Sequence, residues 1–189
     1  VAKGTGNIVI YKSSDDSTVE TFNVASSPLI TGTGTNTITI NPTSDLAEQT
    51  SYYIQIASTA FDDLYGNSYE GITDKTTYNF TTADETAPTL SSTSSTSIAE
   101  NTTTVHTYTT DETVTWSLNG GDDSALFAIN SSTGALTFSS APDYESPTDS
   151  DSNNTYVVVV RATDAASNTS DQTLTVSVSD VEESSSDSS

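Results

Sequence analysis

The acidic residues of this chain are the ones that could bind a ligand or take part in a reaction, and many of them lie in short segments of its second half. Four such segments occur in order along the chain: Ala99-Glu100-Asn101, Pro142-Asp143-Tyr144-Glu145, Ala162-Thr163-Asp164 and Ser179-Asp180-Val181-Glu182-Glu183. Carboxylate oxygens are ligands for hard cations, and one short loop seldom supplies enough of them to hold such an ion. A cation site built from these residues therefore requires distant loops to converge.

The charge balance also favours cations as partners. The chain has 189 residues, with 26 Asp and Glu against 4 Lys and Arg, and a formal net charge of −22. A surface of this sign repels nucleic-acid phosphate and anionic lipid, so we expect neither nucleic-acid binding nor membrane insertion. Division after residue 85 gives −8 for the first part and −14 for the second. The second part is the stronger candidate for cation binding.

The residue types exclude several kinds of active site. Cysteine is absent, which removes disulfides, thiolate metal sites and cysteine nucleophiles. His106 is the one histidine, so a zinc site with two histidines is impossible. The sequence contains no nucleophile elbow, phosphate loop or dinucleotide fingerprint. We therefore predict that the protein is not an enzyme.

The order of strand-like segments predicts an all-β protein with two domains. Apolar residues alternate with polar ones over residues 7–12, 19–24, 37–40, 52–56 and 78–80, and again near 105 and over 114–118, 136–138, 156–162 and 174–178. The segment 83–88 between these groups is polar and contains a proline, as a linker would. One short helical turn is expected over residues 44–48, with Ser44 or Asp45 as its cap.

The second half resembles a cadherin repeat. The four acidic segments carry this resemblance, together with Phe127-Ala128-Ile129-Asn130 and Thr133-Gly134 between them. In that family the corresponding acids bind Ca²⁺ at one end of a β-sandwich. The resemblance implies that Glu100, Asp143, Glu145, Asp180 and Glu183 are the calcium ligands of this pole.

The same resemblance implies a second calcium site at the opposite pole. Its ligands would be Asp111 and Asp164, joined by Asp84 and Glu85 from the linker and by Asn168 as a further oxygen donor. Two like charges about 4 Å apart repel by about 1 kcal/mol in water and by about 4 kcal/mol at an effective dielectric constant of roughly 20. Without a cation we expect this joint to splay, and calcium would reverse the effect.

The first half resembles the bacterial Ig-like domain of S-layer proteins and large surface adhesins. The resemblance is carried by residues 32–42, Asp45-Leu46-Ala47, Thr50-Ser51-Tyr52-Tyr53, Phe61 to Asn67 and the closing Tyr78-Asn79-Phe80-Thr81-Thr82. Members of that family usually begin with a further stretch that has no counterpart before Val1. We therefore expect an N-terminally truncated domain in a piece of a larger protein.

Taken together, these patterns predict two tandem Ig-like/cadherin-like Greek-key β-sandwiches. The expected domains are a bacterial Ig-like domain over 1–85, a cadherin-like domain over 86–183 and a disordered Ser-rich tail over 184–189. The resemblance implies monomeric, calcium-stabilised extender modules on the bacterial surface, as in large secreted RTX-type adhesins. Their partners would be adjacent modules of the same polypeptide, with a glycan or surface protein bound by a distal domain.

Two alternatives share this fold. One is a recognition module that binds carbohydrate or peptide with the help of Ca²⁺, for which Tyr65, Tyr69 and Tyr144 are candidate contacts. The other is an accessory module of a secreted hydrolase. A fold alone does not choose among these functions.

Several other residues have structural interpretations. We expect a hairpin tip at Asp15-Asp16, a tight turn at Asp62-Asp63 with Gly66-Asn67, a solvated loop around Asp149, Asp151, Asn153 and Asn154, and core positions for Trp116, Phe127 and Ile129.

Overall fold

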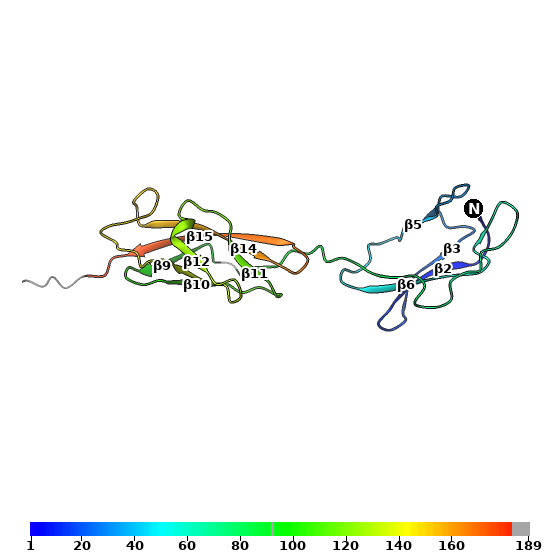
Figure 1. The fold of residues 1–189 in the computed structure, drawn as a ribbon, viewed down its shortest axis with the longest axis horizontal. Helices are drawn as coiled ribbons and strands as arrows, with labels where there is room; N and C mark the ends of the chain where they lie inside the picture. Colours follow the sequence, from blue (N-terminus) through cyan, green and yellow to red (C-terminus); the bar gives the residue numbers. More distant parts are fainter. Residues whose placement is uncertain (92, 183–189) are drawn as a thin grey trace, which may run out of the picture. The chain divides into compact units, whose positions relative to one another are not determined.

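The structure, a computed structural model, describes residues 1–91 and 93–182 (Figure 1). It divides into two compact units, one over residues 1–84 and one that begins at Glu85. The described part of both units is built from β-strands, and the all-β fold class is confirmed. Within the described residues there is no helix with the length and apolar character needed to cross a membrane. The predicted tail over 184–189 lies outside the described residues.

The first unit is built around a four-stranded antiparallel sheet with the order β3-β2-β6-β8. These strands are β2 (Asn7–Lys12), β3 (Thr18–Asn23), β6 (Ser51–Ile56) and β8 (Asn79–Thr81). Two short ribbons complete the unit: β1 (Ala2–Lys3) with β7 (Phe61–Asp62), and β4 (Ile30–Thr31) with β5 (Thr39–Ile40). The strands predicted over 7–12, 19–24, 52–56 and 78–80 form the main sheet, and the one predicted over 37–40 forms β5. The other two-residue strands were not predicted.

The core of the first unit follows from period-two alternation. Ile8 and Ile10 of β2 are buried, and they pack with Phe22 of β3 and Ile30 of β4. Alternate residues of a strand point to one face, so β2 places both isoleucines on the same side of the sheet. The hairpin tip predicted at Asp15-Asp16 is confirmed, because β2 and β3 pair directly and Asp16 has a φ of 58° in the turn between them.

The helical turn predicted over residues 44–48 is wrong. The backbone of Ala47 forms hydrogen bonds with side chains and not with the backbone of a helical turn. Its N–H donates to the hydroxyl of Tyr52 at 3.0 Å, and its carbonyl accepts from the hydroxyl of Thr82 at 2.6 Å. Leu46 packs against the core of the unit. These contacts hold the segment as an irregular connection into β6.

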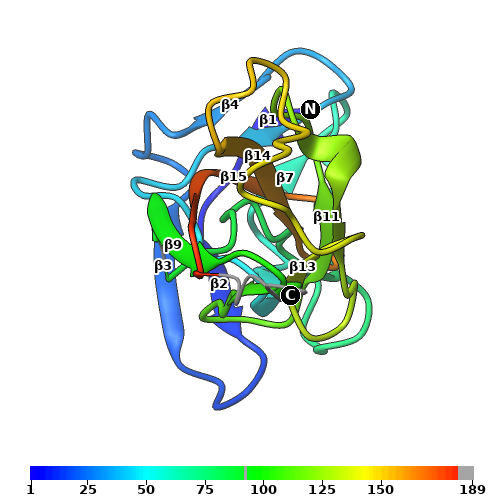
Figure 2. The same cartoon turned by 90° about the vertical axis from the view of Figure 1, so that its left-hand side faces the viewer.

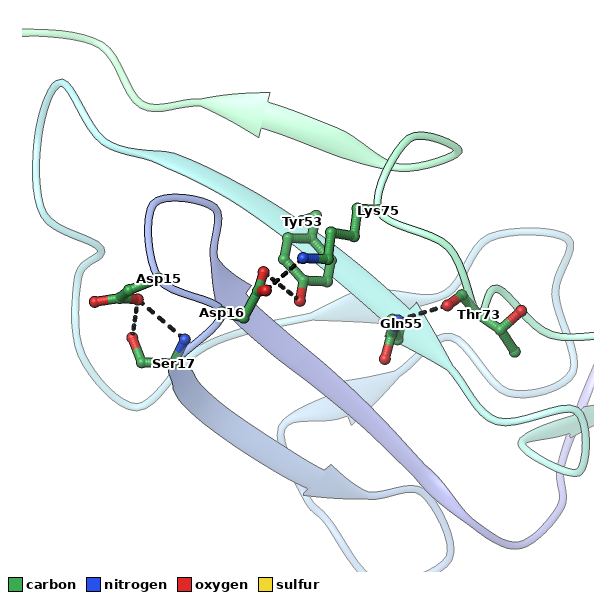
Figure 3. Close-up of polar contacts among 7 residues, drawn as sticks. All are labelled: Asp15, Asp16, Ser17, Tyr53, Gln55, Thr73 and Lys75. Atoms are coloured by element: carbon green, nitrogen blue, oxygen red, sulfur yellow. Dashed lines mark hydrogen bonds and ion pairs between the residues drawn. The ribbon is translucent and has the colours of Figure 1, made fainter.

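A polar cluster ties the 73–75 loop to the β2–β3 hairpin across β6 (Figure 3). The carboxylate of Asp16 forms an ion pair with the ammonium group of Lys75 and accepts the hydroxyl of Tyr53 at 3.1 Å. Burial and the hydrogen bond to Asp16 raise the pKa of Tyr53. On the same strand, Nε2 of Gln55 donates to the carbonyl of Thr73 at 2.6 Å. The cluster anchors a long loop that has little secondary structure of its own.

The second unit contains two sheets, with the orders β11-β14-β15-β9 and β10-β13-β12. Their strands are β9 (Ser95–Ala99), β10 (Thr104–Thr107), β11 (Thr115–Leu118), β12 (Phe127–Ile129), β13 (Ala135–Phe138), β14 (Thr155–Thr163) and β15 (Thr169–Ser179), and the described residues also form a 3-10 turn, η1 (Ser124–Leu126). The first and last strands, β9 and β15, pair in parallel. Their carboxyl ends therefore meet at the same end of the unit, which Figure 2 views end-on.

The core of the second unit lies between these two sheets. Every second residue of β14 is buried, including Tyr156 and Val158, and Leu174 of β15 and Leu136 of β13 are fully buried as well. Trp116 packs in this core, as predicted. Phe127 is also confirmed as a core residue, and Ile129 packs against the same cluster while half-buried. This packing fixes the strand ends from which the acidic loops emerge.

Candidate metal centre

Three carboxylates converge at the end of the second unit where β15 finishes. Glu100 follows β9, Glu145 lies in the loop between β13 and β14, and Asp180 follows β15. Each offers an oxygen that lies within 4.8 Å of the others. The parallel pairing explains why Glu100 and Asp180 meet, since Ala99 is in register with Ser179 and the N–H of Glu100 donates to the carbonyl of Ser179 at 3.0 Å. We call this group the exit pole.

Glu100 is the buried member of the exit pole, with a side chain 2% exposed. Its Oε2 accepts the backbone N–H of Tyr144 and its Oε1 accepts that of Val181, both at 2.8 Å. These two hydrogen bonds hold the pKa of Glu100 below its usual value, although burial acts in the opposite direction. The carboxylate is therefore ionised and fixed in place by backbone from two different loops.

Glu145 is exposed, and the negative charges of the neighbouring carboxylates oppose its ionisation. A hydrogen bond from its own N–H lowers its pKa, but desolvation and the charges of Glu100, Asp180 and Asp143 outweigh that bond and raise it. The carboxylate of Asp143 instead closes a turn, because its Oδ1 accepts the N–H groups of Glu145 and Ser146 at 3.1 Å each. The turn presents Glu145 toward the other carboxylates.

The donor set of the exit pole fits a divalent cation. Three carboxylates come from separate segments, and a carboxylate oxygen that accepts one N–H retains a second lone pair for a metal ion. Calcium takes roughly 6 to 8 oxygen ligands, so carbonyl or water oxygens would have to complete its shell. Of the residues predicted for this pole, Glu100, Glu145 and Asp180 are brought together. Asp143 lies in the adjoining turn, and Glu183 lies outside the described residues.

The opposite end of the second unit holds a smaller acidic group. Asp164 is 7% exposed, and its carboxylate accepts the N–H of Asn168 at 2.8 Å and the side-chain amide of Asn168 at 2.9 Å. Burial raises the pKa of Asp164, but these hydrogen bonds outweigh it and lower the pKa. An oxygen of Glu112 lies within 4.8 Å of an oxygen of Asp164. The side-chain amide of Asn168 also reaches the carbonyl of Thr86 at 3.2 Å.

Glu112, and not the predicted Asp111, approaches Asp164 at this end of the unit. The carboxylate of Asp111 accepts the N–H of Thr89 at 2.8 Å, so it fastens the first residues of the unit. The adjacent acids Asp111 and Glu112 indicated this region in the sequence. The sequence does not indicate which of the two side chains approaches Asp164. Asp84 belongs to the first unit, where it accepts the amide of Gln49 at 2.9 Å, and Glu85 is exposed at the start of the second unit.

The polar loop before β14 differs from the solvated loop that the sequence predicts. Asp149 is 5% exposed, and its carboxylate accepts the N–H groups of Asn153 at 2.7 Å and Asn154 at 3.3 Å. Asp123 is also buried, and it accepts the N–H groups of Ser150 and Val157. The loop is therefore ordered around two buried carboxylates that replace missing backbone hydrogen bonds.

The first unit carries a cavity that bears on the recognition alternative. It has a volume of about 430 Å³, and its lining includes Ile38, Phe61, Asp62 and Tyr69. Tyr65, in the turn beside the cavity, is 92% exposed. The turn itself is as predicted: Asp63 accepts the N–H groups of Tyr65 and Asn67, both at 2.8 Å.

Known proteins were compared with the chain by family, by sequence and by structure. The family model of the bacterial Ig-like domain matches residues 2–82, which supports the Ig-like resemblance of the first unit. The search of the curated proteins returned no match.

Among solved structures, the chain is similar to extracellular domains of cadherins and protocadherins. Human CDH23 EC21-23 has 14% identity, with 95% of this chain and 58% of that chain covered and a TM-score of 0.48. The protocadherin gamma B4 extracellular domain has 14% identity, 96% and 26% coverage and a TM-score of 0.46. Domains 3–6 of protocadherin gamma B2 have 20% identity, 50% and 23% coverage and a TM-score of 0.42. The chain thus spans about a quarter of the two protocadherin structures, and these likenesses assign no function to it.

Proposed function

We propose that the two units are calcium-stabilised extender modules of a large bacterial surface adhesin, of the secreted RTX type, and that they hold a distal adhesive domain away from the cell. The observation that supports this most is the exit pole. Three carboxylates from three separate segments converge where the chain leaves the second unit. In this proposal the protein is monomeric and extracellular, and its direct partners are neighbouring modules of the same polypeptide.

Calcium would act on stability by binding the folded form alone. The carboxylates of the exit pole come from distant positions in the sequence, so an unfolded chain does not assemble them. A ligand that binds only the folded state, at about 100 times its dissociation constant, adds about 2.7 kcal/mol of stability per site. The same reasoning applies at the other pole of the second unit to Asp164 and Glu112.

The proposal is tested by measurements on the whole chain in Ca²⁺ and in a chelator. We expect a higher melting temperature in Ca²⁺, with the gain carried by the second unit, whose core contains the one tryptophan, Trp116. Small-angle scattering should give a larger maximum dimension in Ca²⁺ than in chelator. An unchanged melting temperature together with an unchanged maximum dimension would exclude calcium as the stabilising ligand.

A second candidate function is recognition of a neutral carbohydrate by the first unit. The cavity lined by Tyr69 supports it, because an aromatic ring next to apolar side chains suits a sugar face, and Asp62 and Ser68 of the lining offer hydrogen-bonding groups. A glycan array with the wild-type chain and a Tyr69→Ala variant tests this candidate. Binding that is lost in the variant would favour recognition, whereas no binding by the wild-type chain would leave the extender function.

A further inference from the structure

We propose that Asn154 is the positioning residue of the exit pole: through its side-chain amide and its backbone carbonyl it fixes the segments that carry Glu145 and Asp180. The proposal rests on the proposed function only in taking Ca²⁺ as the ligand. Asn154 lies at the end of the loop before β14 and is not one of the converging carboxylates. Nothing in the sequence pattern distinguishes it from the polar residues around it.

The first contact of Asn154 fixes the Glu145 segment. Its Nδ2 donates to the carbonyl of Tyr144 at 2.9 Å. This carbonyl belongs to the peptide group that joins Tyr144 to Glu145. The N–H of Tyr144 is held by Glu100 at 2.8 Å, so both peptide groups of Tyr144 are anchored, one by a pole residue and one by Asn154. The direction in which Glu145 leaves the backbone depends on both bonds.

The second contact of Asn154 fixes the Asp180 segment. Its backbone carbonyl accepts the N–H of Val178 at 2.9 Å, on β15 and two residues before Asp180. Its own N–H donates to the buried carboxylate of Asp149 at 3.3 Å. Asn154 therefore joins the loop that carries Glu145 to the strand that precedes Asp180, and its N–H is bonded to the buried Asp149 of the polar loop.

The properties of Asn154 agree with a role beyond stability. Its φ is 63°, in the left-handed region, which glycine adopts freely and asparagine tolerates. Its Oδ1 is buried without a hydrogen-bond partner among the described residues, and an unpaired buried oxygen costs free energy. Glycine would adopt the same φ without that cost. What glycine lacks is the Nδ2 donor that holds Tyr144, so this bond is the feature that the asparagine contributes.

The test is a calorimetric Ca²⁺ titration of the whole chain and of Asn154→Gly. The variant keeps the φ and removes the amide. We expect calcium affinity at the exit pole to fall about 10-fold or more, as for other groups that orient metal ligands. The matched control is Ser152→Gly, in the same loop and with a φ of 57°, which should bind as the wild type does. Equal affinity in Asn154→Gly and the wild type would overturn the positioning role.

A double-mutant cycle with Glu145→Gln separates positioning from general destabilisation. If Asn154 acts through the Glu145 segment, then Asn154→Gly should have a much smaller effect on calcium affinity when Glu145 has already been changed. An undiminished loss in that background would mean that Asn154 acts elsewhere and would overturn the proposal. If the wild-type chain binds no Ca²⁺, the proposed function is rejected. If the wild-type chain binds Ca²⁺ and Asn154→Gly binds it equally well, only the positioning role is rejected.

Discussion

The Oε1 atom of Glu100 accepts the backbone N–H of Val181 at 2.8 Å, although the two residues are 81 positions apart in the sequence. The carboxylate follows the first strand of the second unit, and the N–H belongs to the segment that follows the last strand. Since the other oxygen of Glu100 holds the N–H of Tyr144, a single side chain joins three segments of the chain. The exit pole is therefore preorganised by one buried acid.

We expect Glu100→Gln to lower the stability of the second unit and to flatten its dependence on acid pH. The amide has one acceptor oxygen, so one of the two N–H groups would face the Nε2 donor. The folded-state pKa of Glu100 is below its ordinary value of 4.5, so its contribution is present above that value and is lost as the pH falls through the folded-state pKa.

Thermal melts in chelator from neutral to acid pH measure this effect. Glu182→Gln is the control, because Glu182 is exposed and stands outside the converging carboxylates. Asp164 also has a lowered pKa, so part of the acid dependence should remain in Glu100→Gln. A variant with the full acid dependence of the wild type would show that the two backbone hydrogen bonds contribute nothing.

Glu145→Gln should change stability in opposite directions with and without calcium. The folded protein raises the pKa of Glu145 through desolvation and the neighbouring carboxylates, against the hydrogen bond from its own N–H. The ionised side chain is thus less favourable in the folded state, so its removal should raise the melting temperature in chelator at neutral pH. In Ca²⁺ the same change removes a proposed ligand and should lower the melting temperature. Shifts of the same sign in both conditions would contradict this.

Tyr108→Phe and Tyr156→Phe should differ although both tyrosines are buried in one core. The hydroxyl of Tyr108 has no hydrogen-bond partner among the described residues, so its removal should leave stability unchanged or raise it. The hydroxyl of Tyr156 accepts the N–H of Thr148 at 3.3 Å, and its loss should cost about 0.5–1.5 kcal/mol. Chemical denaturation followed by Trp116 fluorescence measures both. Equal losses would show that Tyr108 has a partner.

An alkaline titration gives an independent check on Tyr108. Burial raises its pKa to about 12, so its ionisation should form a late phase in the tyrosine absorbance that is missing in Tyr108→Phe. Because the folded-state pKa is raised, the associated stability is complete below the ordinary value near 10 and declines as the pH rises toward 12. If the variant keeps the late phase, that phase belongs to another tyrosine.

Gly134→Ala should destabilise the second unit by more than about 1 kcal/mol. Gly134 has a φ of 69°, and an added Cβ would lie 2.7 Å from the carbonyl oxygen of Tyr108 and 2.9 Å from the ring of Trp116. Gly34→Ala in the first unit is the control, with a φ of 85° and no atom within 4 Å of the added Cβ. A larger loss for the control, measured by denaturation, would show that conformation and not contact decides the cost.

The main strands were predictable because their apolar residues alternate. The strand predicted over 156–162 became β14, in which every second residue is buried. Two-residue strands such as β4 and β7 are too short to show a period, and the partner of β7, β1, lies about 60 residues away in the sequence. The predicted helical turn at 44–48 failed for a related reason, since the hydroxyls of Tyr52 and Thr82 satisfy the backbone of Ala47.

The residues of the candidate site were named from the acidic motifs of the family resemblance. Their separation along the chain would not have indicated that they meet. Glu100, Glu145 and Asp180 are far apart in the sequence: the parallel pairing of β9 and β15 brings Glu100 and Asp180 together, and the hydrogen bond from the N–H of Tyr144 to Glu100 brings in the segment of Glu145. Adjacent acids were harder to separate: Glu112 approaches Asp164, whereas Asp111 binds a backbone N–H. The roles of such neighbours depend on local turns, which a sequence pattern does not resolve.

The parallel alignment of β9 and β15 determines how the second unit responds to tension. Force transmitted along the polypeptide enters at the amino end of β9 and leaves at the carboxyl end of β15. Because the two strands run in the same direction, this pull slides one along the other, and it loads all the pairs from Ser95 with Thr175 to Ala99 with Ser179 at the same time. Rupture must then break those hydrogen bonds together, which gives the module greater resistance to stretching than an arrangement in which strands peel apart one bond after another.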